Sequence, residues 1–345
     1  MGLTKNEKKF ADKLLYKTAR SFYLTINALP DSIRWPLTVT YLLARATDTV
    51  ADELNLPAKE RLSLLHQMQN MIVNYAEWEN HTAINLVKNA LDLHIDKYNL
   101  LFHFHEIVNW LNKFDEETIK NILHVLTTII HGQQFDIDHF PGTGSIACIK
   151  TEAELDNYTY LVAGCVGEFW TKLCINKIKN YSHYSLNILL SLALAFGKGL
   201  QLLNILRDLP QDISKGRCYL PYEQLKQFDI DINHIQHNIQ LLEPLVKVWQ
   251  KKVEKDLQAG WLYILSLNHR HIRAALAIPI LLGFATLKIL QQEPYLTNKQ
   301  PVKVSRWQVR LFTFIAVLSL LSRRFFLLTR FTSISSYIIK IKYEK

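Results

Sequence analysis

The chain has 345 residues, 49% of them hydrophobic and 21% charged, so it can bury a large core and does not belong to the disordered class. Its net charge of +9 is concentrated in residues 301–345, which hold nine Lys and Arg against one acid, Glu344. This distribution argues against a general nucleic-acid surface. The four cysteines form no CxxC pair, which argues against a zinc site or a disulfide scaffold.

Only 11 Gly and 10 Pro interrupt the chain, and no strand alternation stands out, so the sequence predicts an all-α protein. In chain order, the predicted helices are 5–26, 32–51, 58–75, 82–88, 97–113, 116–131, 152–175, 184–212, 222–229, 235–265, 271–291 and 304–330. No linker rich in Pro, Gly or Ser divides the chain. We therefore expect one catalytic domain over residues 1–300 and a basic, apolar segment over residues 301–345.

Two predicted helices each end with a pair of aspartates, Asp48 with Asp52 and Asp208 with Asp212. A spacing of four residues places both carboxylates on one face of a helix. Acids on an apolar helix are costly unless they are paired or bind a metal. Such oxygen ligands suit Mg²⁺, which keeps several waters and shares substrate phosphates. Two pairs therefore predict a metal–diphosphate site where two helices of a bundle face each other.

An arginine accompanies each aspartate pair. Arg45 lies three residues before Asp48, and Arg207 lies directly before Asp208. Arginine can hold diphosphate oxygens through two parallel hydrogen bonds, but the same residues can also form an intrahelical salt bridge. The matched arrangement in two separate segments favours diphosphate binding.

Two further segments offer positive charge. Residues 215–221 follow the second pair and contain Arg217, so they form either a flap that closes over phosphates or a solvated loop. Arg20 and Ser21, near the end of the first predicted helix, either bind an anion or lie at the surface.

A tyrosine- and glycine-containing segment lies inside the predicted helix 152–175. Glycine in a helix interior costs about 1 kcal/mol relative to alanine, so Gly164 and Gly167 indicate either close helix packing or a kink that opens an apolar pocket. Tyr158 and Tyr160 can supply a phenol for proton transfer or cation stabilisation, or they can be ordinary core tyrosines.

The segments 19–22, 41–52, 158–167 and 201–221 together resemble the squalene/phytoene synthase family in order and spacing. The resemblance implies the isoprenoid synthase fold, an all-α single-domain bundle with a central cavity. Within the family, the chain looks like the squalene synthases, particularly bacterial ones. They imply Mg²⁺-dependent condensation of two farnesyl diphosphates to presqualene diphosphate, followed by reduction to squalene with NADPH. Phytoene, dehydrosqualene or presqualene diphosphate synthesis stays open, as does a non-catalytic role as a helical assembly or membrane adaptor.

The resemblance also implies a role for each candidate residue. The expected Mg²⁺ ligands are Asp48, Asp52, Asn204, Asp208 and Asp212. The expected diphosphate-binding residues are Arg20, Ser21, Arg45, Arg207, Arg217 and Arg273. The expected catalytic residues are Tyr41, Tyr158, Asp48 and Asp208, and the expected NADPH-binding residues are Lys303 and Arg306. The sequence has no Rossmann fingerprint, so the use of NADPH rests on the resemblance alone.

The two ends of the chain suggest a location. Residues 1–17 are polar and charged and lack the apolar stretch of a secretory signal, so a cytoplasmic protein is expected. The apolar run 311–321 is shorter than the roughly 20 residues that span a bilayer. With its basic neighbours it either contacts the cytosolic face of an anionic membrane or forms a last core helix. We expect peripheral membrane contact and no nucleic-acid partner.

Overall fold

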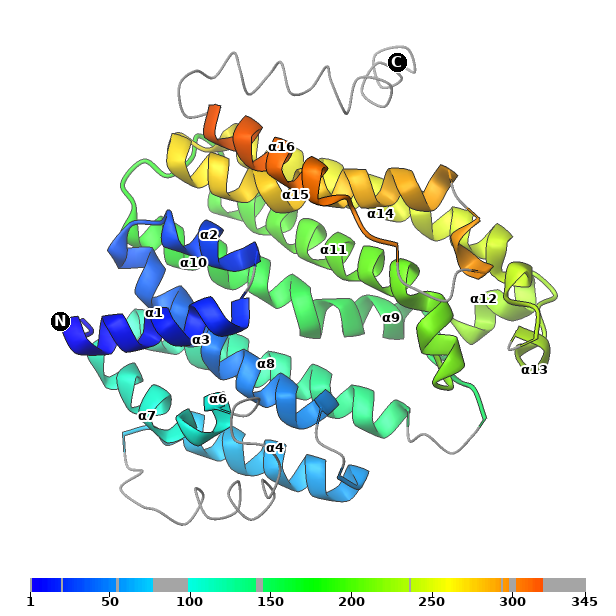
Figure 1. The fold of residues 1–345 in the computed structure, drawn as a ribbon, viewed down its shortest axis with the longest axis horizontal. Coiled ribbons are helices and arrows are strands. Elements are labelled where there is room, and N and C mark those ends of the chain that lie inside the picture. Colours follow the sequence, from blue (N-terminus) through cyan, green and yellow to red (C-terminus); the bar gives the residue numbers. More distant parts are fainter. Residues whose placement is uncertain are drawn as a thin grey trace. The chain divides into compact units, whose positions relative to one another are not determined.

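The fold was described from a computed structural model, which covers residues 2–19, 21–53, 56–76, 99–140, 145–235, 237–292, 294–297 and 302–318. Helices dominate this part of the chain, so the predicted all-α class is confirmed (Figure 1). The chain forms two compact units. Unit 1 comprises Met1–Pro141 and Glu168–Ile178, and unit 2 comprises Gly142–Gly167 and Lys179–Lys345.

Unit 1 is built around helix α3 (Asp31–Asp48), which packs against α1 and α8. The other described elements before residue 141 are α1 (Lys5–Ala19), α2 (Ser21–Asn27), the π-helix η1 (Thr49–Glu53), α4 (Ala58–Val73), α6 (Asn99–Phe102), α7 (Phe104–Asn109), the 3₁₀-helix η2 (Trp110–Lys113) and α8 (Glu116–His139). The core contains Leu42 and Leu43 of α3, which are fully buried against apolar side chains of its neighbours.

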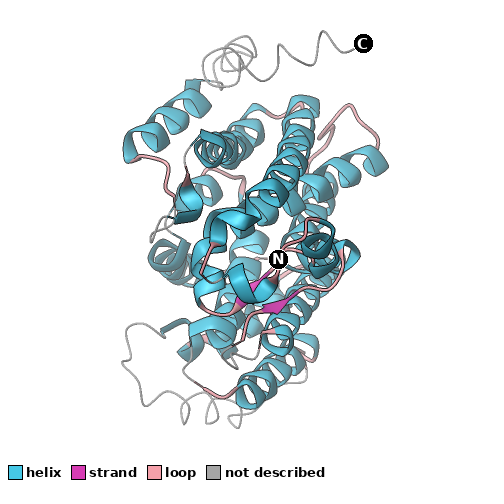
Figure 2. Ribbon diagram, turned by 90° about the vertical axis from the view of Figure 1, so that its right-hand side faces the viewer, coloured by secondary structure: helices cyan, strands magenta, loops and turns pink. Residues whose placement is uncertain are grey.

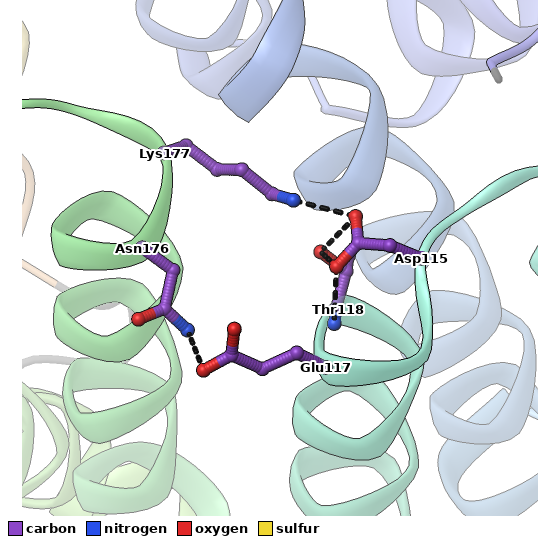
Figure 3. Close-up of polar contacts among 5 residues, drawn as sticks. All are labelled: Asp115, Glu117, Thr118, Asn176 and Lys177. Carbon is purple, nitrogen blue, oxygen red and sulfur yellow. Dashed lines mark hydrogen bonds and ion pairs between the residues drawn. The ribbon is translucent and has the colours of Figure 1, made fainter.

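The start of α8 is tied to the end of helix α10 (Cys165–Lys177) by polar contacts within unit 1 (Figure 3). Asp115 is the N-cap of α8: its carboxylate accepts a hydrogen bond from the backbone N–H of Thr118 at 3.1 Å and forms an ion pair with Lys177. The Asn176 amide donates to Glu117 at 2.6 Å. Partial burial alone would raise the pKa of Asp115, but the hydrogen bonds from Lys177 and Thr118 outweigh it and lower the pKa to about 2.

Unit 2 is built around the 29-residue helix α11 (Leu186–Ser214), which packs against α14 and α15. Its other elements are β1 (Ala147–Cys148), α9 (Glu152–Thr159), the π-helix η3 (Tyr160–Gly164), the first residues of α10, β2 (Arg217–Cys218), α12 (Tyr222–Gln227), α13 (Ile232–Ile235), the 3₁₀-helix η4 (Ile239–Leu242), α14 (Glu243–Ser266), α15 (Arg270–Gln292), the 3₁₀-helix η5 (Tyr295–Thr297) and α16 (Arg306–Leu318). The strands β1 and β2 form a short parallel pair (Figure 2).

Small residues allow α11 and α14 to approach each other closely. A Cβ added at Gly199 of α11 would lie 2.5 Å from the Cβ of Asp256, and one at Gly260 of α14 would lie 2.4 Å from the ring of Phe196. Both distances are too short for a side chain, so this contact requires glycine on each helix.

The structure refines several predicted helices. The predicted helix 5–26 is divided into α1 and α2, and the predicted helix 152–175 is divided by a π turn into α9 and α10. The β1–β2 pair was not predicted, because two-residue strands are too short to show an alternating pattern. The predicted helix 82–88 lies outside the described residues.

Two helices, α11 and α15, are long and apolar enough to cross a membrane by length and composition. In the apolar window of α11, 39% of residues are buried inside the protein, and in that of α15, 50%. Both helices pack against α14, which is how core helices of the same composition behave, so these two features are weak evidence for a membrane span.

Candidate active site

The first aspartate segment lies at the end of α3 in unit 1. Arg45 forms an ion pair with Asp48, and both side chains are about one-third exposed. The hydroxyl of Tyr41, one turn earlier, donates to the backbone carbonyl of Thr18 at 3.1 Å, which joins α3 to the last turn of α1. The carboxylate of Asp48 is thus held beside a cation at the surface of unit 1.

Asp52 does not continue the α-helix of Asp48. It lies in the π-helix η1, where each backbone bond spans five residues instead of four. Four residues then fall just short of one turn, so Asp48 and Asp52 still project from similar sides of the helix. The π turn is supported from α4, because Arg61 donates a hydrogen bond to the backbone carbonyl of Ala51. Single π turns are frequent at functional sites, and this one separates the two aspartates.

The second aspartate segment lies on α11 in unit 2. Asn204, Asp208 and Asp212 are spaced by four residues on one continuous helix, so their side chains share a face. All three are half-buried, whereas Ile205 and Leu209, which each follow one of them by a single residue, are buried on an adjacent face. The i, i+4 spacing that the sequence predicted is therefore kept without a change of helix type.

Arg207 holds Asp208 through two hydrogen bonds. Its Nε donates to one carboxylate oxygen at 2.9 Å, and an Nη donates to the other at 2.6 Å. These hydrogen bonds raise the pKa of Arg207, burial opposes them, and the charges of Asp208 and Asp212 add to the increase. The influence of Asp212 shows that the second carboxylate lies in the same electrostatic neighbourhood. Both arginines thus form the intrahelical salt bridge that the sequence left open as the alternative, and their binding of diphosphate stays a prediction.

The segment after α11 is a short strand rather than a free loop. Gly216 has φ +78°, a left-handed conformation that ends the helix and turns the chain into β2. Strand β2 pairs in parallel with β1, with Arg217 opposite Ala147. The half-buried Arg217 is therefore positioned by backbone hydrogen bonds a few residues after Asp212.

The tyrosine segment meets this strand pair. The ring of Tyr158 stacks on that of Tyr219 with 5.2 Å between the ring centroids and 25° between their planes. Both tyrosines are buried. Tyr219 lies within residues 215–221, directly after β2, and no pattern in the sequence indicated its contact with Tyr158. The stacked rings thus attach the tyrosine segment to the residue that directly follows β2.

The glycines of this segment pack against α11, which is one of the two alternatives that the sequence left open. A Cβ at Gly167 would lie 2.3 Å from the carbonyl oxygen of Ala193, and a Cβ at Gly197 would lie 2.5 Å from that of Ala163. These distances confirm close helix packing. The π-helix η3 lies between Tyr158 and Gly167. The tyrosine segment and the first aspartate segment therefore each contain a π turn.

Comparison with known proteins identifies the family of this chain. Residues 15–308 match the family model described as squalene/phytoene synthase. The chain belongs to the squalene/phytoene synthase family. It is similar to the squalene synthase ERG9 of Gibberella zeae, with 26% identity over 310 residues, which cover 85% of this chain and 61% of the relative. It is also similar to ERG9 of Saccharomyces cerevisiae, with 27% identity over 217 residues, 63% of this chain and 46% of the relative. The chain thus spans about half to three-fifths of these two relatives.

Solved structures share the fold of this squalene/phytoene synthase family member. The complex of TcSQS with the ligand BPH1237 has a TM-score of 0.71 and 20% identity, and the match covers 91% of this chain and 87% of that chain. The squalene synthase HpnC from Alicyclobacillus acidocaldarius has a TM-score of 0.60 and 16% identity, with 82% and 92% covered. At these identities the likeness establishes the all-α isoprenoid synthase fold.

The remaining candidate residues for binding diphosphate and NADPH lie outside the two aspartate segments. Arg273 is buried on α15, and its guanidinium donates to the backbone carbonyl of Leu267 at 2.7 Å, at the end of α14. Lys303 is exposed before α16. Arg20 lies outside the described residues, and the side chains of Ser21 and Arg306 are not described. Their assignments to diphosphate and NADPH stay predictions.

The donor set was tested against the predicted Mg²⁺. Within the described ranges, no group of three or more His, Cys, Asp or Glu side chains is close enough to hold one metal ion. Each segment instead offers carboxylates on a partly exposed face, and α11 adds the amide oxygen of Asn204. A donor set of a few oxygens fits Mg²⁺, which takes its other ligands from water and phosphate. The aspartate pairs belong to different units, so a shared site stays a prediction.

Two cavities lie within the units. One of about 470 Å³ in unit 1 is lined by residues that include Lys8, Trp35 and Lys177. One of about 290 Å³ in unit 2 is lined by residues that include Gln250 and Tyr295. No aspartate of the two pairs lines either of these cavities. Neither of them is therefore the predicted central cavity, which stays a prediction.

Proposed function

We propose that this chain is a Mg²⁺-dependent prenyltransferase of the squalene synthase type. It condenses two farnesyl diphosphates to presqualene diphosphate and reduces this intermediate to squalene with NADPH. The observation that carries the proposal is the repeated arrangement in the two units, where an arginine is already paired with the first aspartate of each pair. Membership of the squalene/phytoene synthase family supports the same chemistry.

In this proposal the charged residues prepare the diphosphate for departure. Asp48, Asp52, Asn204, Asp208 and Asp212 would hold Mg²⁺. Bound Mg²⁺ supplies positive charge that neutralises the leaving diphosphate. Arg45 and Arg207 keep the carboxylates oriented and present further N–H donors to phosphate oxygens. Arg217, fixed by the β1–β2 pair, adds a third cation at the end of α11, and Arg20, Ser21 and Arg273 complete the predicted diphosphate-binding set.

The tyrosines handle the positive charge that remains on the prenyl chain. Tyr158 and Tyr219 present stacked aromatic rings, whose faces stabilise a nearby cation and exclude water. The Tyr158 phenol is the proposed proton acceptor or cation stabiliser, and Tyr41 is held from α3 by its hydrogen bond to Thr18. Lys303 and Arg306 are the proposed contacts to NADPH, before and at the start of α16.

The proposed domain boundary, with catalysis in residues 1–300 and a basic segment in 301–345, assigns α16 to membrane contact. Trp307 is 69% exposed, Phe314 is 59% exposed and Arg310 is exposed between them. At i, i+3 and i+7 these side chains share one face of the helix, and Phe312 is buried at a different angle. Exposed aromatic rings beside a cation fit the interface of an anionic membrane. The protein would then be cytoplasmic and peripheral, which suits an apolar product.

Product analysis tests the reaction. The full chain is incubated with Mg²⁺ and either farnesyl or geranylgeranyl diphosphate, with and without NADPH, and the hydrocarbons are identified by mass spectrometry. Squalene formed only with NADPH supports the proposal. Phytoene from geranylgeranyl diphosphate, dehydrosqualene, or accumulation of presqualene diphosphate despite NADPH would replace it with the corresponding alternative. No turnover with any substrate would favour the non-catalytic adaptor.

Vesicle sedimentation tests the membrane contact. The variant Trp307→Ser/Phe314→Ser is compared with Tyr16→Ser, which removes an aromatic side chain of α1 that is also 69% exposed. We expect Trp307→Ser/Phe314→Ser to lose binding to vesicles that contain anionic lipid and Tyr16→Ser to keep it. Equal binding of both variants would contradict the contribution of this helix face.

A further inference from the structure

Two of the four cysteines are brought together by the β1–β2 pair. The parallel register places Cys148 directly opposite Cys218. Residues opposite each other in a ladder project to the same side of the sheet, and neighbouring strands are about 4.8 Å apart. Disulfide-bonded residues usually have Cα atoms about 4.4–6.8 Å apart, so the backbone spacing already suits a covalent bond. In sequence these cysteines are 70 positions apart, and their pairing could not be predicted from spacing.

The two thiols differ in access. Cys148 is half-buried, so it is the more accessible of the two to a small solute, whereas Cys218 is fully buried. The other two cysteines, Cys165 and Cys174, lie buried on the single helix α10. The cysteine pair therefore has an outer sulfur that can be attacked first and an inner sulfur that can only react with its neighbour.

We propose that Cys148 and Cys218 form a dithiol site that a peroxide converts reversibly into a disulfide between β1 and β2. The Cys148 thiolate attacks one oxygen of the peroxide, the O–O bond breaks, and sulfenic acid and water are formed. The Cys218 sulfur then attacks the Cys148 sulfur, the S–O bond breaks, and a second water leaves with the Cys218 proton. Two sulfurs lose two electrons in total, and the peroxide gains them.

The environment favours the reduced form at rest. Hydrogen bonding with Cys218 and burial both raise the pKa of the Cys148 thiol, so little thiolate is present at neutral pH. Oxidation is therefore slow at neutral pH and accelerates as the pH rises. A bond across directly opposed strand residues also strains the ladder, and strained disulfides are reduced readily. The disulfide thus forms under sustained oxidation, and the two thiols are restored when reductant is supplied.

The consequence concerns the residues beside Cys218. Arg217 and Tyr219 flank it, and the backbone bonds that join β2 to β1 include Ala147 N–H to Gly216 O at 2.9 Å and Ile149 N–H to Cys218 O at 3.1 Å. A disulfide ties this segment covalently to residues 147–149. The inference stands on the strand pairing and does not depend on the reaction proposed above.

Peptide mapping of the full chain tests the site. Reduced protein is treated with hydrogen peroxide, free thiols are blocked with N-ethylmaleimide, and the trypsin digest is analysed without reductant. We expect a cross-linked species that joins the peptide ending at Lys150 to the peptide 218–226, lighter by two hydrogens than the two reduced peptides. Dithiothreitol should abolish it, and it should form several-fold faster at about pH 8.5 than at about pH 7.

Two variants serve as controls. Cys148→Ser should lose the cross-link, and Cys165→Ser should keep it. The mapping of the unmodified sequence needs no variant, so a folding defect in Cys148→Ser leaves the result readable. Over-oxidation of Cys148 to sulfinic acid while Cys218 stays alkylatable after unfolding would overturn the proposal, and so would cross-links that involve Cys165 or Cys174.

Discussion

The two aspartate segments have the same spacing but different backbones. In unit 1 the helix changes from α to π between Asp48 and Asp52, whereas in unit 2 the α-helix α11 carries both Asp208 and Asp212, with Pro210 between them. Their supports differ too. The π turn is held by a side chain, through the hydrogen bond of Arg61 to Ala51, and α11 is held by direct backbone contact at glycines. The same spacing of two aspartates can thus be carried by backbones that different neighbouring segments stabilise.

Loss of either first aspartate should have the largest effect. We expect Asp48→Asn and Asp208→Asn each to reduce kcat by on the order of 100-fold or more, because each removes a charge that serves the metal and orients an arginine. Asp138→Asn, at an exposed position of α8, is the matched control and should keep normal activity. Steady-state kinetics with farnesyl diphosphate measures the effect. Full activity in one of the two variants would show that the segments do not share a role.

The close helix contact at the glycines of α11 should be the most sensitive to added side-chain volume. Gly197→Ala places a Cβ against the backbone of Ala163, which cannot move aside easily, so we expect a loss of about 1–3 kcal/mol in the free energy of unfolding. Gly2→Ala, where a Cβ would meet open space, should change it little. Urea unfolding of both variants gives the comparison. Unchanged stability of Gly197→Ala would mean that the helices can separate at no cost.

The arginine of the second segment should not tolerate lysine. Arg207 makes two hydrogen bonds to Asp208, one from Nε and one from an Nη. Lysine cannot reproduce a bidentate contact, so we expect Arg207→Lys to raise KM about tenfold, which corresponds to about 1.4 kcal/mol. Arg45→Lys tests the corresponding ion pair of unit 1. An unchanged KM in both variants would contradict a role of these arginines in diphosphate binding.

The smallest effect is expected at the Asp115–Lys177 ion pair of unit 1 (Figure 3). Asn can still cap α8, so Asp115→Asn removes only the charge, and the exposed carboxylate limits the loss to about 0.5–1 kcal/mol at neutral pH. The folded pKa of about 2 lies below the ordinary value of 3.8, so the contribution is complete above 3.8 and is lost as the pH falls toward 2. Unfolding at several pH values measures this. A gap between the two proteins that stays constant down to pH 2 would assign the loss to the cap.

Much of this architecture follows from sequence. Helical class, the aspartate spacings and the neighbouring arginines depend on local periodicity, and the glycines correctly indicated close packing because an interior glycine is otherwise unfavourable. Arg273 shows the limit: the family resemblance indicates a role for it, but no sequence pattern predicts that its buried guanidinium donates to the carbonyl of Leu267. Sequence gives the chemistry of a side chain, and its partners depend on which turns pack beside it.

The sequence by itself determined that the chain is helical, that it carries two aspartate pairs with adjacent arginines, and that it resembles its family. Only tertiary structure decided that Asp52 lies in a π turn, that Arg217 lies on a strand and that Cys148 lies opposite Cys218. The physical reason is the range of the interactions. Periodicity records which face of a helix is buried, whereas a π turn or a two-residue strand exists only because a distant segment supplies its hydrogen bonds and packing.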